Sequence, residues 1–186
     1  MRFYDLMYGI IFTPQKTILK IKKFEPIAAS FFVLFISSFI ITITNTNLIL
    51  TSNIINLLPL TLVGVFGHIF GTIFLSLILV FLSKFLGGTG DYFALFTGLS
   101  LSSLVFVFLP VGLFIAEFTS IFMINDFIRI LVFIWYLLLT IEVIRKTQEI
   151  SLFSSILTIT GSFASMVILI LVISISIAGS VMVLFA

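Results

Sequence analysis

The side chain of this sequence that is best suited to a chemical role is a histidine within a long apolar stretch. His68 is the only histidine, and between Glu25 and Lys84 the chain carries no other ionisable group. A histidine in such a place could relay protons or switch a contact between helices, because it titrates near neutral pH. The alternative is a neutral imidazole that is hydrogen-bonded to a serine or a backbone carbonyl of a neighbouring helix. No carboxylate shares this stretch, which favours the second interpretation.

Asp126 and Arg129 form a second candidate pair. They are three residues apart, so on a helix they share one face and could neutralise each other. Arg129 could instead face a polar cavity together with Glu117. We expect the first arrangement, in which the long arginine side chain also reaches toward the polar boundary of the membrane.

The sequence contains few groups that could support catalysis. With one histidine and no cysteine, a single chain cannot build a multi-histidine or thiolate metal centre, and it cannot form disulfides. The motifs His-Glu-x-x-His and Gly-x-Ser-x-Gly are absent, and the glycine run at 87–90 lacks the Walker pattern and predicts a flexible turn. We therefore expect a protein that is not an enzyme, without catalytic residues, cofactor or metal.

Composition indicates the environment in which these groups lie. The chain is 61% apolar and 9% charged, whereas roughly a quarter of the residues of a soluble domain are charged. An apolar helix of ~20 residues crosses a hydrocarbon core of about 30 Å. The sequence thus predicts an all-α integral membrane protein whose first partner is the lipid bilayer. A net charge of +2 is too small to indicate nucleic-acid binding.

Charged and turn-forming residues divide the apolar sequence into five predicted transmembrane helices in one domain, residues 27–186. A kink is expected near Pro110 and Gly112, because proline removes a helical hydrogen bond. The start of the last apolar segment, from Ser151, is expected to be partly interfacial. The predicted helices run from about 27 to 44, 58 to 83, 92 to 116, 121 to 141 and 161 to 186.

The positions of lysine and arginine predict the orientation. If the N-terminus is cytoplasmic, Arg129 is the one Lys or Arg on the outer side, and the other eight lie inside. Cytoplasmic segments of membrane proteins carry such an excess of positive charge. We therefore expect a cytoplasmic N-terminus and an external C-terminus. The Ile- and Phe-rich composition and short loops favour the plasma membrane of a prokaryote.

Residues 1–26 are predicted to form a cytoplasmic headpiece with a basic amphipathic helix. Thr13-Pro14 is typical of a helix start, and Pro26 turns the chain into the membrane. Such a helix gathers lysines on one face and Ile18 and Ile21 on another, which suits the headgroup layer of a membrane. A solvated linker is the alternative. The candidate membrane-surface residues are Lys16, Lys20, Lys22 and Lys23.

Three glycines surround the histidine: Gly64, Gly67 and Gly71. Gly67 and Gly71 are four residues apart and share a helical face, a spacing that lets two membrane helices approach closely. We expect a tight helix contact at this face, made either within the chain or with a second copy. Val65 is expected to lie away from it.

Two stretches, Ile11 to Ile18 (IFTPQKTI) and Leu86 to Tyr92 (LGGTGDY), together with single residues, resemble the Yip family of Ypt/Rab-interacting-protein-like membrane proteins. The sequence from Ile11 to Ile18 (IFTPQKTI), ahead of basic residues and a first span, resembles the opening of that family. The resemblance continues through Leu86 to Tyr92 (LGGTGDY), Pro110 and Trp135, and so covers nearly the whole chain. It implies five membrane helices with a cytosolic N-terminus, in agreement with the charge pattern.

For function, the resemblance implies a protein that organises or recruits membrane partners. Its expected protein partners are further copies of itself, in a homo-oligomer, or other membrane proteins. Eukaryotic members bind prenylated Rab GTPases through a long N-terminal region, but the short basic headpiece here is similar to that of short prokaryotic members. The Rab-binding role is therefore not carried over. The alternative interpretation belongs to a different functional class: the protein would be a small transporter or channel subunit with a polar path near His68, Arg129 and Glu117.

Overall fold

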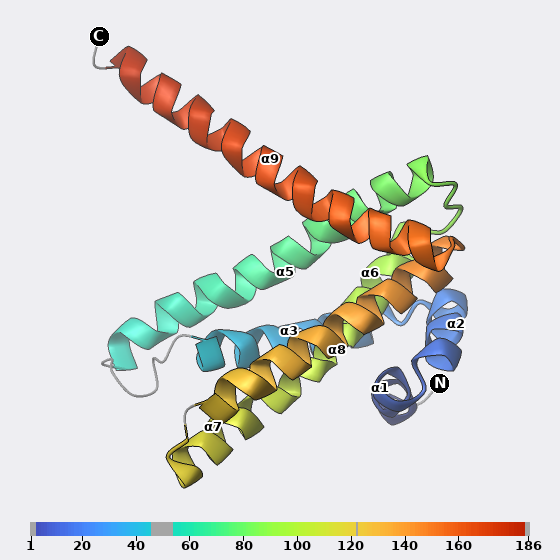
Figure 1. Cartoon of the computed structure of the whole chain (residues 1–186), viewed down its shortest axis with the longest axis horizontal. Coiled ribbons are helices and arrows are strands. Elements are labelled where there is room, and N and C mark those ends of the chain that lie inside the picture. Colours follow the sequence, from blue (N-terminus) through green and yellow to red (C-terminus); the bar gives the residue numbers. More distant parts are fainter. Residues whose placement is uncertain (1–2, 46–53, 122, 185–186) are drawn as a thin grey trace.

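The computed structural model describes residues 3–45, 54–121 and 123–184, and these residues form helices and turns without any strand (Figure 1). The all-α class predicted from composition is therefore confirmed. The elements are α1 (Phe3–Phe12), α2 (Pro14–Phe24), α3 (Ile27–Asn45), α5 (Ile54–Phe85), α6 (Tyr92–Ser102), the 3-10 segment η1 (Ser103–Phe108), α7 (Leu109–Thr119), α8 (Met123–Gln148) and α9 (Leu152–Leu184).

Five helical stretches of the described residues are long and apolar enough to cross a membrane, as expected for a polytopic bundle. The first has the predicted bounds, and the second and third are close to theirs. The fourth extends beyond the predicted end near 141, because the charged residues that follow remain in the last turns of α8. The stretches are Ile27–Thr44, Leu58–Phe85, Tyr92–Thr119, Met123–Gln148 and Leu152–Val172.

The fifth stretch begins at Leu152, and the residues before 161, for which a partly interfacial lead-in is predicted, belong to the same continuous helix. Ser151 accepts a hydrogen bond from the Ser154 backbone N–H at 3.1 Å and thereby caps the first turn. Further along, hydroxyls donate to carbonyls one turn back, as Ser155 does to the Ser151 carbonyl at 2.9 Å. Because these polar groups are satisfied inside the helix, the polar sequence does not require an interfacial segment.

The third span is interrupted one turn earlier than predicted. The six residues of η1 follow a 3-10 geometry, and α7 starts at Leu109 with Pro110 in its first turn. Proline lacks an N–H and its ring crowds the carbonyl four residues earlier, here that of Phe106, so the disturbance lies upstream of Pro110. Gly112 lies downstream in regular helix, where it allows α7 to approach Ile128 of α8.

The helices pack around α6, η1 and α8, which lie side by side at the centre of the bundle (Figure 1). We call "headpiece end" the end at which α2, the turn at 86–91 and the α8–α9 connection at 149–151 meet. The start of α9 contacts α5 and α8 there, and the rest of α9 extends away from the other helices (Figure 1). The larger core cluster includes Leu95 and Leu99 of α6 and Val143 of α8.

The apolar face of α2 does not lie in the headgroup layer, contrary to the prediction. Ile18 and Ile21 are fully buried, in one cluster with residues of α6 and α8. Thr13 and Pro14 begin the helix as expected, but the Thr13 hydroxyl donates back to the carbonyl of Gly9 instead of capping α2. The amphipathic pattern therefore reflects docking onto the bundle, and only the lysine face of α2 remains open.

Candidate functional site

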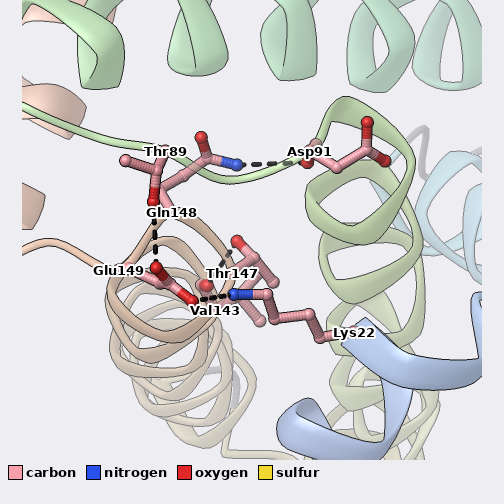
Figure 2. A network of polar contacts seen from close by, with 7 residues as sticks. All are labelled: Lys22, Thr89, Asp91, Val143, Thr147, Gln148 and Glu149. Carbon is pink, nitrogen blue, oxygen red and sulfur yellow. Dashed lines mark hydrogen bonds and ion pairs between the residues drawn. The ribbon is translucent and has the colours of Figure 1, made fainter.

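A network of polar contacts joins three distant segments at the headpiece end (Figure 2). Lys22 of α2 forms an ion pair with one carboxylate oxygen of Glu149. The Thr89 hydroxyl, in the turn before α6, donates to the other oxygen of Glu149 at 2.9 Å. Glu149 reaches both partners because it reverses the chain after α8 with a left-handed backbone (φ 58°). The headpiece, the 86–91 turn and the α8–α9 connection are thus held together.

Gln148 supplies the buried part of this network. Its side chain is fully buried, and its amide nitrogen donates to the carbonyl of Asp91 at 3.2 Å (Figure 2). Its amide oxygen accepts from the Ser83 hydroxyl at 3.0 Å, and its backbone carbonyl accepts from the Thr89 N–H at 3.1 Å. One side chain therefore ties the end of α8 to the end of α5 and the start of α6.

The glycine run at 87–90 is a turn, as predicted, but the structure shows it closely packed. A Cβ on Gly90 would lie 1.9 Å from the Thr147 carbonyl oxygen, and one on Gly88 would lie 2.8 Å from the Ser83 carbonyl oxygen. Gly87 has φ 85°, a left-handed conformation that favours glycine. Asp91 then caps α6 by accepting from the Phe93 N–H at 2.8 Å. The turn thus needs glycine for close approach to α8.

The electrostatics of the network favour a charged Glu149. The hydrogen bond from Lys22, the hydrogen bond from Thr89 and the positive charge of Lys22 lower the pKa of the Glu149 carboxyl below its usual value. Glu149 is exposed to solvent, and solvent screens the attraction between the two charges. The ion pair therefore orients the headpiece more than it stabilises the fold.

His68 lies on α5 and its ring faces α3. The Nδ1 atom is 2.7 Å from the Ser38 hydroxyl oxygen, and that hydroxyl donates to the Leu34 carbonyl at 2.5 Å. A hydroxyl has one proton to donate, so it accepts from the imidazole, and Nδ1 carries the proton. This arrangement agrees with the second interpretation of His68, a neutral ring held by a serine of the neighbouring helix.

Arg129 does not pair with Asp126, in contrast to the prediction. Its guanidinium donates to the Thr44 carbonyl oxygen at 2.6 Å, at the last turn of α3. Carbonyls at a helix C-terminus lack helical partners and carry partial negative charge, so they compete well for a cation. Asp126 is exposed, and the ion pairs in the described part of the chain are Lys22–Glu149 and Glu142–Arg145.

Glu117 lines a cavity of about 350 Å³ between α3 and α7, at the end opposite the headpiece. Its other lining residues are mostly apolar and include Phe39, Pro110 and Phe114. Two smaller hollows of described residues lie at the start of α2 and between α5, α8 and α9. Neither His68 nor Arg129 lines any of these three. The candidate polar groups are therefore not brought together in any of these three hollows of the described residues.

The predicted close helix contact is present at one of the three glycines, and within the described part of the chain it is absent at the other two. A Cβ on Gly64 would lie 2.5 Å from the Thr42 side chain, so α3 and α5 do meet closely there. Nothing lies within 4 Å of a Cβ built on Gly67 or Gly71. Val65, placed by the prediction away from the contact, is 2% exposed and faces the bundle. Close packing at Gly67 and Gly71 remains a prediction only for a second copy.

Sequence reasoning did not identify Ser38, Gln148 or the close approach at Gly90 as parts of a site. Serine in a membrane helix commonly bonds to its own backbone, so its spacing does not reveal a partner. Among the described residues, no group of three or more His, Cys, Asp or Glu side chains is arranged to hold a metal ion.

Comparisons of the chain with known protein families, characterised proteins and solved structures find no match.

Proposed function

We propose that this membrane protein is not an enzyme and that it organises or recruits membrane partners in the manner implied by its resemblance to the Yip family. The observation that carries the proposal is the meeting of the two stretches on which the resemblance depends. Residues 11–18 and 86–92 are far apart in sequence. Helix α2 begins within residues 11–18, and it packs on α6, which begins at the end of residues 86–92. The Lys22–Glu149–Thr89 contacts then join both to the end of α8.

The headpiece end is the proposed recruiting surface, and we propose that it is cytoplasmic in a prokaryotic plasma membrane. All but one of the described Lys and Arg residues lie at this end, and Arg129 lies at the other. A reporter that is active only in the cytoplasm should be silent after Ala186 and active when fused ahead of the headpiece. The opposite pattern would overturn this orientation. The basic residues at the headpiece end are Lys16, Lys20, Lys22, Lys23, Lys84, Arg145 and Lys146.

A transporter is the alternative, and the geometry supports it less. His68 is hydrogen-bonded to Ser38, and Arg129 donates a hydrogen bond to a carbonyl at the end of α3. Glu117 lines a cavity that neither of these two residues lines. A conduction path requires polar groups that converge on a common cavity.

Photo-crosslinking in cells tests the proposed function. A photoreactive residue at Lys20, which is exposed on α2, should give discrete protein adducts, whereas one at Met123, exposed at the opposite end, should not. Gly90→Val should remove the Lys20 adducts, because the side chain would displace the 86–91 turn from Thr147. Lack of adducts at Lys20, together with ion flux in proteoliposomes that His68→Ala abolishes, would favour the transporter and refute the proposal.

A further inference from the structure

Helix α1 is a structured element that the sequence did not predict, and it is firmly held. Leu6 and Ile10 are buried in the same cluster as Ile18 and Ile21 of α2. Gly9 allows α1 to approach α2 closely, because a Cβ there would lie 2.3 Å from the Thr17 hydroxyl oxygen. The inward face of α1 is therefore occupied by the protein itself.

The opposite face of α1 presents a row of aromatic rings. Tyr4, Tyr8 and Phe12 are spaced four residues apart and are 74%, 53% and 59% exposed. The rings follow one another along the helix, with centroids 6.4 Å apart for Tyr4–Tyr8 and 4.7 Å apart for Tyr8–Phe12. Exposing this much apolar surface to water is unfavourable, while tyrosine is enriched where a membrane meets water.

The contacts of α1 place it beside the membrane spans and not beyond their ends. The ring of Phe3 packs against that of Phe32 with centroids 5.8 Å apart. Phe32 lies five residues into the span that starts at Ile27, which is about 8 Å along the helix. Helix α1 also contacts α6 and η1, both parts of the third span. Its outward face therefore lies at the depth of the lipid that surrounds these spans.

Charged groups set how deeply α1 can lie. Asp5 is exposed on its first turn, near Tyr4, and a carboxylate in the hydrocarbon core would be costly. On the adjoining α2, Lys16, Lys20 and Lys23 are exposed and suit the phosphates of lipid headgroups. These charges place α1 at the boundary between headgroups and acyl chains. Interfacial helices typically bury their apolar face ~5–10 Å into this boundary.

We propose that α1 is an interfacial membrane helix, with the row Tyr4–Tyr8–Phe12 inserted among the lipids of the leaflet at the headpiece end. The occupant of this face is the lipid leaflet and not a second protein, because the adjoining α2 exposes lysines and the spans that α1 contacts are apolar enough to cross the membrane. The headpiece is thus an additional membrane-binding element beside the five spans. This inference is independent of any protein partner.

Tryptophan fluorescence of the full-length protein in vesicles tests the insertion. Trp135 is the only tryptophan, and Trp135→Phe removes it conservatively, since its ring stacks on Phe108. Tyr8→Trp in that background reports on the row, and Gln15→Trp reports on the exposed start of α2. The vesicles contain anionic lipid and phosphatidylcholine brominated at either a shallow or a deep position of the acyl chain.

We expect blue-shifted emission from Tyr8→Trp, with about twofold quenching by shallow bromines, weaker quenching by deep ones and little effect on Gln15→Trp. Emission typical of water, without quenching, would overturn the proposal because α1 would lie in solvent. Blue-shifted emission without quenching by either lipid would also overturn it, since protein would then cover the row. If Tyr8→Trp does not fold, Tyr4→Trp at the more exposed end of the same row serves as the probe and has the same outcomes.

Discussion

Gly90→Ala should destabilise the fold strongly although it adds only one methyl group. The new Cβ would lie 1.9 Å from the Thr147 carbonyl oxygen and 2.6 Å from the Gln148 Cα, and both are backbone atoms that cannot rotate away. Ordinary van der Waals contact for a Cβ begins near 3.4 Å. The 86–91 turn must therefore move away from α8 by more than 1 Å, which exceeds the tolerance of a hydrogen bond.

The magnitude follows from the contacts that this movement breaks. The Thr89 N–H loses the Gln148 carbonyl and the Gln148 amide loses the Asp91 carbonyl, at 3.1 and 3.2 Å in the parent structure. Each such bond contributes about 1 kcal/mol, and overpacking adds ~1–3 kcal/mol. A loss of about 4 kcal/mol corresponds to a decrease of roughly 10 °C in the midpoint of thermal unfolding for a chain of this size.

Thermal unfolding in detergent, followed by circular dichroism at one fixed heating rate, measures this effect. Gly67→Ala is the matched control, because nothing lies within 4 Å of its Cβ and alanine favours helix over glycine by up to ~1 kcal/mol. We expect the control to unfold at or slightly above the parent midpoint. If Gly90→Ala unfolded with the parent, the close approach of the turn to α8 would be wrong.

Three further predictions concern the polar contacts. Gln148→Leu leaves its buried partners without hydrogen bonds and should reduce the free energy of unfolding by about 1–3 kcal/mol in the same assay; an unchanged midpoint would contradict the network. Because the pKa of Glu149 is lowered, the Lys22–Glu149 pair contributes to stability above the usual carboxyl pKa of 4.5, and this contribution is lost as the pH falls through the folded-state pKa. The parent protein should therefore lose stability on acidification, and Glu149→Gln should lose less. Equal losses in the two proteins would argue against the ion pair. Ser38→Ala should cost ~1–3 kcal/mol by leaving the His68 N–H unpaired, and it should cost much less in a His68→Phe background, whereas additive effects would mean that the two side chains do not interact.

The sequence alone determined the all-α class, the number of apolar helices and the segregation of charge. These properties are local, because a run of about 20 apolar residues fits a membrane whatever its neighbours are. The first span, Ile27–Thr44, therefore has its predicted bounds. The bonding of His68 to a hydroxyl of a neighbouring helix was also foreseeable, since a buried polar group in an apolar surrounding must find a partner.

Only the tertiary structure decided which faces meet. Gly64 and Gly67 lie on the same apolar helix, yet one is pressed against Thr42 and the other faces open space. Ile18 and Ile21 suited lipid and protein equally well by sequence, and they are buried by α6 and α8. In a membrane, lipid-facing and protein-facing surfaces are both apolar, so hydropathy does not distinguish them. That distinction depends on the fit of side chains between helices, which the linear order of residues does not contain.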